Sequence, residues 1–223
     1  MYRPPRFADN AATERSFFFP SAMKPFFSRS SLSRTALAGA LVLSAWPALS
    51  ATVEVAGVKL EDRVTVAGKP LVLNGAGIRY KAVFKVYTAG LYVEKPANTT
   101  AGLLDQPGPK RMTITMLRDI DSAELGKLFA RGMEDNMEKG SFAQLIPGVM
   151  RMSQVFTNHK VLKAGETFVL DWIPGTGTVL TVKGKVEGEP FKEEAFFEAL
   201  MRIWLGPKPA DWQLKDALLG GKK

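Results

Sequence analysis

Cysteine is absent from the 223-residue sequence, and histidine occurs once, as His159. Without cysteine the chain cannot form disulfide bridges, zinc fingers or a thiol nucleophile, and one histidine is too few for a histidine-rich metal site. A Ser-His-Asp triad could use His159, but the sequence contains no Gly-x-Ser-x-Gly elbow to carry the serine. We expect His159 at the surface or at a helix C-terminus, because it directly follows a predicted helix.

The sequence also lacks an apolar run long enough to cross a membrane. The run at 36–46 has 11 residues, whereas a helical span needs about 20. It follows three basic residues, Lys24, Arg29 and Arg34, and it ends at Pro47 before a stretch of small residues. A basic segment, a short apolar run and small residues together form the pattern of a secretory signal peptide.

This pattern predicts where the protein begins and where it is sent. We expect translation to start at Met23, with residues 1–51 forming an N-terminal extension and signal peptide that is cleaved after Ser50 or Ala51. No cysteine follows the apolar run, so a lipoprotein anchor is excluded. The mature chain is predicted to be periplasmic or secreted, with no transmembrane segment after signal removal.

The excess of positive charge is modest once it is divided along the chain. The formal net charge is +8, but residues 1–50 hold six basic and two acidic side chains, so half of the excess lies in the predicted leader. The remaining +4 is typical of a soluble domain and requires no polyanion. Nucleic acid is therefore not a predicted partner, and the sequence indicates no oligomeric state.

Residues 52–223 are predicted to form one domain. Apolar residues make up 46% and charged residues 23% of the chain, the balance of a foldable globular protein. Strand patterns come first, then two helices together, a hairpin and further helices; this order favours an α+β fold, an antiparallel sheet covered by helices. The expected elements are hairpin strands within 52–56 and 63–73, strands 81–94, 111–117, 167–173 and 178–186, a helix that starts at 121, and helices 99–105, 147–156, 192–205 and 210–219.

The clearest helix begins at Asp121-x-x-Glu124, a pattern close to a capping box. Five residues then recur at helical spacing on one face: Leu125, Leu128, Phe129, Gly132 and Met133. Asp119 and Asp121 do not predict a metal site, because Asp121 is better used as the N-cap and no histidine or third carboxylate lies nearby. The sequence implies no metal and no cofactor.

One arginine stands out because it lies in an otherwise apolar and aromatic strand region. Arg79 follows the pair Gly75 and Gly77, and the same stretch holds Tyr80, Tyr87 and Tyr92. A guanidinium does not lose its charge, so an inward Arg79 needs an anionic partner. That partner is either a carboxylate of the protein at the sheet edge or a bound ligand, and the sequence leaves both open.

Three segments resemble the chalcone isomerase family. They are Gly75-Ala76-Gly77-Ile78-Arg79, the strand Lys85-Val86-Tyr87-Thr88-Ala89-Gly90-Leu91-Tyr92-Val93-Glu94, and the helix end Arg202-Ile203-Trp204-Leu205-Gly206. The resemblance covers most of residues 52–220 and is carried mainly by the first block. It implies a chalcone isomerase-like open-faced β-sandwich, a large antiparallel sheet under a helical layer, with a ligand cleft between them. The bacterial secreted branch is the expected place for a chain with a signal peptide.

The resemblance also suggests a site, with departures from the isomerases. Arg79 matches their active-site arginine, which holds an anionic oxygen. Tyr87 stands where they have a strand threonine, and apolar residues replace their other hydrogen-bonding groups at the helix positions. The expected ligand-binding residues are Arg79, Tyr87, Leu125, Phe129, Gly132, Met133, Ile203 and Trp204. One cation among apolar side chains suits an amphiphile with an anionic head.

Three functions follow, in order of preference. The first is non-catalytic binding of a fatty acid or another small lipophilic anionic ligand, with its head group on Arg79 and Tyr87. The second is an isomerase of the intramolecular lyase type, in which Arg79 stabilises negative charge and Tyr87 acts as the acid. The third is a structural or interaction domain with a solid core. A shared fold does not choose between them.

Overall fold

The computed structural model describes residues 51–221, and these residues form one compact unit by their internal contacts. The predicted signal peptide, with its apolar run at 36–46, lies outside the described residues. In the described part, no helix is both long enough and apolar enough to cross a membrane.

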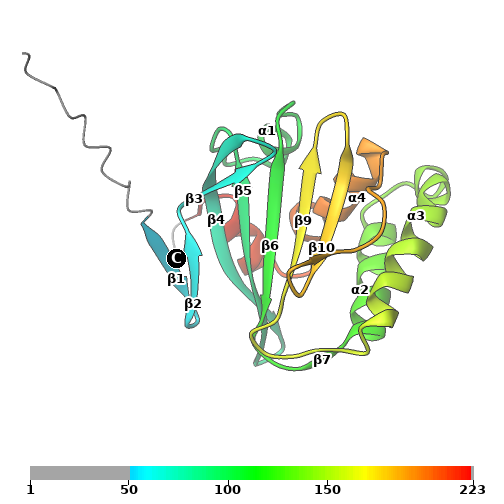
Figure 1. Ribbon diagram of the computed structural model, residues 1–223, viewed down its shortest axis with the longest axis horizontal. Coiled ribbons are helices and arrows are strands. Elements are labelled where there is room, and N and C mark those ends of the chain that lie inside the picture. The colour runs from blue at the N-terminus through cyan, green and yellow to red at the C-terminus, as the bar shows by residue number, and fades with distance from the viewer. Residues whose placement is uncertain (1–50, 222–223) are drawn as a thin grey trace, which may run out of the picture. The chain divides into compact units, whose positions relative to one another are not determined.

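A seven-stranded antiparallel sheet forms the centre of the domain, in the spatial order β11-β10-β9-β6-β5-β4-β3 (Figure 1). Its strands are β3 (Arg63–Val66), β4 (Lys69–Lys81), β5 (Phe84–Val93), β6 (Lys110–Met116), β9 (Thr167–Ile173), β10 (Gly177–Val182) and β11 (Lys185–Val186). Two small two-stranded ladders accompany it, β1 (Thr52–Val55) with β2 (Val58–Glu61), and β7 (Ile120–Asp121) with β8 (Val161–Leu162).

Five helices complete the described domain: α1 (Thr100–Leu104), α2 (Ser122–Asp135), α3 (Lys139–Asn158), α4 (Glu194–Leu205) and α5 (Trp212–Leu218). Helix α4 packs on β10 and α5 packs on β4, while α2 packs on both α3 and α4. Figure 1 shows α2, α3 and α4 gathered beside β9 and β10. The α+β prediction, an antiparallel sheet covered by helices, is confirmed.

Local sequence explains helix α2 well. The Asp121 carboxylate accepts a hydrogen bond from the backbone N–H of Glu124 at 2.9 Å, as the capping pattern predicts. Leu125, Phe129 and Met133 are buried on the predicted face, whereas Leu128 keeps 40% of its surface exposed. The helix therefore presents an apolar stripe to the core and one further apolar side chain at its edge.

An aromatic cluster joins α2 to the sheet and to α4. Phe129 contacts Phe156, Phe168 and Trp204 edge-to-face, with ring centroids 5.4 to 5.5 Å apart. Such edge-to-face pairs stabilise a core beyond the area they bury. The cluster joins α2 to α3 through Phe156, to β9 through Phe168 and to α4 through Trp204.

Three predicted boundaries are wrong. The predicted strand 178–186 is a hairpin of β10 and β11, which turns at Lys183 and Gly184. Helix α3 begins at Lys139 rather than at Pro147, which lies inside the helix. A proline there cannot donate to the carbonyl four residues earlier, but burial of Leu145, Val149 and Phe156 on one side keeps the helix intact. The predicted strand 81–94 is the second half of a hairpin: β4 runs to Lys81, Ala82 and Val83 form the turn, and β5 starts at Phe84.

Candidate functional site

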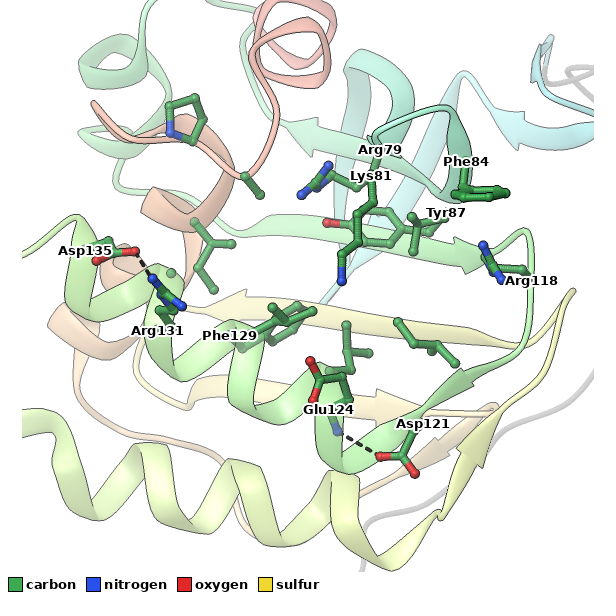
Figure 2. Close-up of a pocket in the computed structure, with 18 of the residues that line it drawn as sticks. Arg79, Lys81, Phe84, Tyr87, Arg118, Asp121, Glu124, Phe129, Arg131 and Asp135 are labelled. Carbon is green, nitrogen blue, oxygen red and sulfur yellow. Dashed lines mark hydrogen bonds and ion pairs between the residues drawn. The ribbon is translucent and has the colours of Figure 1, made fainter.

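A cavity of about 490 Å³ lies between the sheet and helix α2 (Figure 2). Strands β4 and β5 supply one wall, α2 supplies the opposite wall, and the segment that joins α4 to α5 closes one side. Its apolar lining consists of Phe84, Val86, Tyr87, Ile120, Leu125, Leu128, Phe129, Ile203, Pro209 and Ala210. The volume is within the range of about 300–1,000 Å³ that is usual for small-molecule pockets.

The structure brings together six of the eight predicted site residues around this cavity. They are Arg79, Tyr87, Leu125, Phe129, Gly132 and Ile203. Met133 and Trp204 are fully buried and do not line the cavity. Met133 belongs to the main hydrophobic core, whereas Trp204 reaches the site indirectly through its hydrogen bond to Tyr87.

The glycine pair before Arg79 allows helix α5 to lie directly on the backbone of β4. A Cβ at Gly77 would come within 2.7 Å of the Ala217 methyl group, and a Cβ at Gly75 would overlap the Ala217 carbonyl oxygen. Only glycine permits this approach. Because α5 lies so close, its N-cap residue Asp211 is placed beside Arg79.

Asp211 is the protein carboxylate that accompanies Arg79. One Asp211 oxygen accepts hydrogen bonds from the backbone N–H groups of Gln213 and Leu214, at 2.8 and 3.2 Å, which caps α5. The other accepts from the backbone N–H of Tyr80 at 2.8 Å and lies 3.7 Å from an Arg79 nitrogen. That last separation is longer than a hydrogen bond, so Asp211 balances the charge of Arg79 without saturating its donors.

A second arginine of the sheet shows what a saturated pair looks like. Arg111 donates two hydrogen bonds to the Asp171 carboxylate, at 2.6 and 2.7 Å, in the bidentate geometry typical of structural ion pairs. Arg79 has no such geometry with Asp211, and its side chain, 23% exposed, lines the cavity. The two arginines therefore differ in kind: Arg111 holds strands together, and Arg79 faces a space that a ligand can occupy.

Tyr87 lies directly opposite Arg79 in the β4–β5 register and supplies a second donor to the cavity. Its phenol oxygen accepts a hydrogen bond from the Trp204 indole N–H at 2.9 Å. An indole nitrogen can only donate, so the hydroxyl proton of Tyr87 is left for another acceptor. Desolvation by burial raises the pKa of Tyr87 to about 12, although the Trp204 hydrogen bond and the Arg79 charge oppose the rise. Tyr87 is therefore a neutral donor at physiological pH.

Charged side chains form the rim of the cavity. Arg131 lies 3.7 Å from Asp135 on the same helix, Asp121 caps α2, and Asp119 accepts a hydrogen bond from the backbone N–H of Ala164 at 2.9 Å. The other charged lining residues are Lys81, Arg118, Glu124 and Lys208. These four are exposed, which leaves Arg79 as the cation that lies deepest among the described lining residues.

The sequence did not single out Lys81, Arg118, Lys208 or Asp211. Lys81 could have been found, because it lies two residues after Arg79 and so projects from the same face of a strand. Asp211 gave no local signal beyond that of a helix N-cap. Its placement depends on how α5 packs across the glycines of β4. The residue of β4 that donates to Asp211, Tyr80, lies 131 positions earlier in the chain.

Comparison with known protein families identifies the family of this chain. The family model described as chalcone isomerase-like matches residues 52–220. The chain belongs to the chalcone isomerase-like family. The chalcone isomerase-like domain also resembles the crystal structure of the Arabidopsis thaliana fatty-acid binding protein AtFAP1, with 14% sequence identity and a TM-score of 0.57. The match covers 74% of this chain and 93% of that one. Comparison with curated proteins gave no match.

The chalcone isomerase-like fold predicted from the motifs is thus confirmed, and it places Arg79 and Tyr87 on neighbouring strands. No group of three histidine, cysteine, aspartate or glutamate residues within 51–221 is arranged to hold a metal ion. His159 ends helix α3 as its C-cap, the type of position expected for it, and its Nε2 lies 3.1 Å from a Glu187 carboxylate oxygen.

Proposed function

We propose that this protein binds a fatty acid or another lipophilic carboxylate without transforming it. The ligand carboxylate would contact Arg79 and the hydroxyl of Tyr87, and its apolar body would lie along α2 against Leu125, Leu128 and Phe129. The observation that carries the proposal is the convergence of a partly buried guanidinium and a neutral phenol on one apolar cavity. The name of AtFAP1, a fatty-acid binding protein of similar fold, supports the same ligand class.

The chemistry of the two donors suits a carboxylate better than a neutral head group. A guanidinium that is not engaged in a bidentate pair can donate two parallel hydrogen bonds to a carboxylate. Tyr87, with a pKa raised to about 12, donates its proton but is a poor base near neutral pH. Binding therefore needs no proton transfer, whereas the isomerase alternative requires a base in addition to these two groups.

The test is calorimetric titration of the predicted mature chain, residues 52–223, with a long-chain fatty acid and with the fatty alcohol of equal length. Arg79→Gln should weaken fatty-acid binding by about tenfold or more, since hydrogen bonds to charged groups contribute about 1.5–3 kcal/mol. Tyr87→Phe should weaken it about fivefold. The alcohol should bind Arg79→Gln and the unmodified chain almost equally.

Arg131→Gln is the matched control, because it also removes a cation that lines the cavity, but one that is exposed and accompanied by Asp135. It should change fatty-acid affinity less than twofold. Equal fatty-acid affinity of Arg79→Gln and the unmodified chain would contradict the proposed role of Arg79. If the unmodified chain converted a bound compound into a product, and Arg79→Ala and Tyr87→Phe did not, the isomerase function would be indicated instead.

We further propose that the protein acts in the periplasm after removal of the leader. The support is the leader pattern alone: basic residues, the apolar run at 36–46 and the small residues near Ser50. Fractionation of the source cells and mass spectrometry of the N-terminus should find a chain that starts at Ala51 or Thr52. A chain that keeps residues 23–50 in the cytoplasmic fraction would contradict this localisation.

A further inference from the structure

The turn between β4 and β5 exposes apolar side chains where tight turns usually carry polar residues or glycine. Five consecutive residues, Lys81 to Lys85, are exposed, and Val83 and Phe84 keep 83% and 58% of their surfaces open. Two other two-residue turns of the same seven-stranded sheet end in glycine, Ala67-Gly68 and Lys183-Gly184. Backbone geometry does not demand Val83, and together with the adjacent Phe84 it forms an exposed apolar patch, the kind of feature that marks an interaction surface.

Positive charge surrounds this apolar tip. Lys81 and Lys85 border it in sequence, and the Arg118 guanidinium lies over the Phe84 ring at 5.1 Å from its centroid. Asp119 follows Arg118 and is also exposed, with its carboxylate accepting a hydrogen bond from the Ala164 backbone N–H, so one negative charge lies beside three positive ones. The tip thus combines two exposed apolar side chains with three exposed cations, which is the composition that anionic lipid surfaces attract.

The tip is continuous with the cavity. Lys81, Phe84 and Arg118 are exposed and also line the cavity, so the cavity opens at this end of the sheet. Figure 2 shows Phe84 and Arg118 side by side at one end, with Arg79 and Tyr87 further along the same wall. A surface that engaged Val83 and Phe84 would therefore meet the mouth of the cavity.

We propose that the β4–β5 tip, residues Lys81 to Lys85 together with Arg118, docks the domain on an anionic lipid bilayer. Val83 and Phe84 enter the interfacial region, and Lys81, Lys85 and Arg118 contact lipid phosphates. The mouth of the cavity then faces the lipid, which lets an amphiphile pass between bilayer and cavity without crossing water. This last consequence rests on the proposed binding function, whereas the docking itself does not.

Flotation of the ligand-free mature chain, residues 52–223, with vesicles tests the docking. Vesicles that mix phosphatidylcholine with phosphatidylglycerol should bind it, pure phosphatidylcholine vesicles should bind it much more weakly, and added salt should release it. Val83→Asp and Lys85→Glu should each reduce binding to the mixed vesicles by about tenfold. Neither residue lines the cavity, so fatty-acid affinity should be unchanged in both variants.

Two matched controls carry the same substitutions elsewhere. Met150→Asp changes another exposed apolar residue, 68% exposed on α3. Lys192→Glu changes an exposed lysine next to Phe191, which bridges to Thr178 at the opposite end of the sheet. Both controls should bind vesicles as the unmodified chain does within about twofold, and thermal unfolding should show that all four variants fold.

The orientation can be measured independently, because the chain has no cysteine. An environment-sensitive dye attached through Val83→Cys should shift its emission to shorter wavelength on mixed vesicles, and the same dye attached through Met150→Cys should not. Equal shifts at both positions, no vesicle binding, or equal loss in tip and control variants would each overturn the proposal. Val83→Asp should lose vesicle binding and keep fatty-acid binding, whereas Arg79→Gln should lose fatty-acid binding and keep vesicle binding. That pair of results would show that the two activities are separate.

Discussion

The Trp204 indole N–H donates a hydrogen bond of 2.9 Å to the phenol oxygen of Tyr87, across 117 positions of the chain. Both side chains are buried, and only Tyr87 reaches the cavity. The bond determines the polarity of the site, because it makes the phenol an acceptor toward Trp204 and leaves its proton for the cavity. In the proposed binding function Trp204 is therefore a positioning residue, which would act on the ligand through Tyr87.

Replacement of Trp204 by phenylalanine should weaken fatty-acid binding more than its effect on stability explains. Trp204→Phe removes the donor and part of a buried ring, so we expect the free energy of unfolding to fall by about 2–3 kcal/mol. Fatty-acid affinity should fall about threefold to tenfold, because the Tyr87 hydroxyl can then rotate. Urea unfolding and calorimetric titration measure the two effects.

Trp172→Phe is the control for that experiment. Trp172 is also buried and stacks on Phe197 with ring centroids 5.7 Å apart, but it does not line the cavity. We expect a loss of stability of similar size, about 2 kcal/mol, with fatty-acid affinity retained. If both variants lost affinity to the same extent, the effect of Trp204 would be structural and its positioning role would be wrong.

Stability should fall in strongly alkaline solution because of Tyr87. Its pKa is raised from 10.0 to about 12, mainly by desolvation, so between these pH values the unfolded chain has lost a proton that the folded chain keeps. The free energy of unfolding then decreases with pH, by about 2 kcal/mol across this interval for Tyr87 alone. Below pH 10 the contribution is fully present.

Comparison with Tyr87→Phe isolates this contribution, since other groups titrate equally in both chains. Urea unfolding below pH 10 and between pH 10 and 12 should give a smaller alkaline loss for Tyr87→Phe. Absorbance titration should also show one late-ionising phenol fewer in that variant. Parallel stability curves for the two chains would mean that Tyr87 ionises normally in the folded state.

The glycine pair of β4 should be intolerant to the smallest side chain. Gly75→Ala places a methyl group where the Ala217 carbonyl oxygen lies, so α5 has to move away from β4. We expect a loss of about 2–3 kcal/mol in the free energy of unfolding and a change in fatty-acid affinity, because Asp211 moves with α5. Denaturant unfolding and ligand titration check both effects.

Gly140→Ala is the matched control within helix α3. A Cβ at Gly140 meets nothing within 4 Å, and alanine favours a helix over glycine by about 1 kcal/mol. This variant should be as stable as the unmodified chain or slightly more so. Equal behaviour of the two variants would contradict the close packing of α5 on β4.

The two arginines of the sheet should separate stability from binding. Arg111→Met breaks a bidentate pair and leaves Asp171, with a side chain only 10% exposed, without its partner, so we expect a loss of about 2–3 kcal/mol in stability. Fatty-acid affinity should be unchanged. Arg79→Met should show the opposite pattern, with affinity lost and stability changed by less than about 1 kcal/mol, because Asp211, also 10% exposed, keeps its hydrogen bonds from three backbone N–H groups. Thermal unfolding and titration of both variants distinguish these outcomes.

Much of the fold follows from local pattern. The N-cap at Asp121, the alternation of Met112 and Ile114 in β6, and the apolar face of α2 could all be predicted, because each depends on neighbours within one or two turns or along one strand. The motif around Arg79 predicted the chalcone isomerase-like family, which is confirmed. The start of α3 could not be predicted in this way, because core packing outweighs the local cost of Pro147.

The sequence by itself determined which chemistry the site could contain: no thiol, one histidine, and an arginine with a tyrosine among apolar residues. Only the tertiary structure decided how those groups are used. Asp211 reaches Arg79 because α5 packs on two glycines, and Trp204 directs the Tyr87 proton because the fold brings this one residue of α4 to the phenol oxygen on β5. Such contacts join segments more than 100 residues apart, and their geometry depends on packing between elements rather than on the preferences of any one segment.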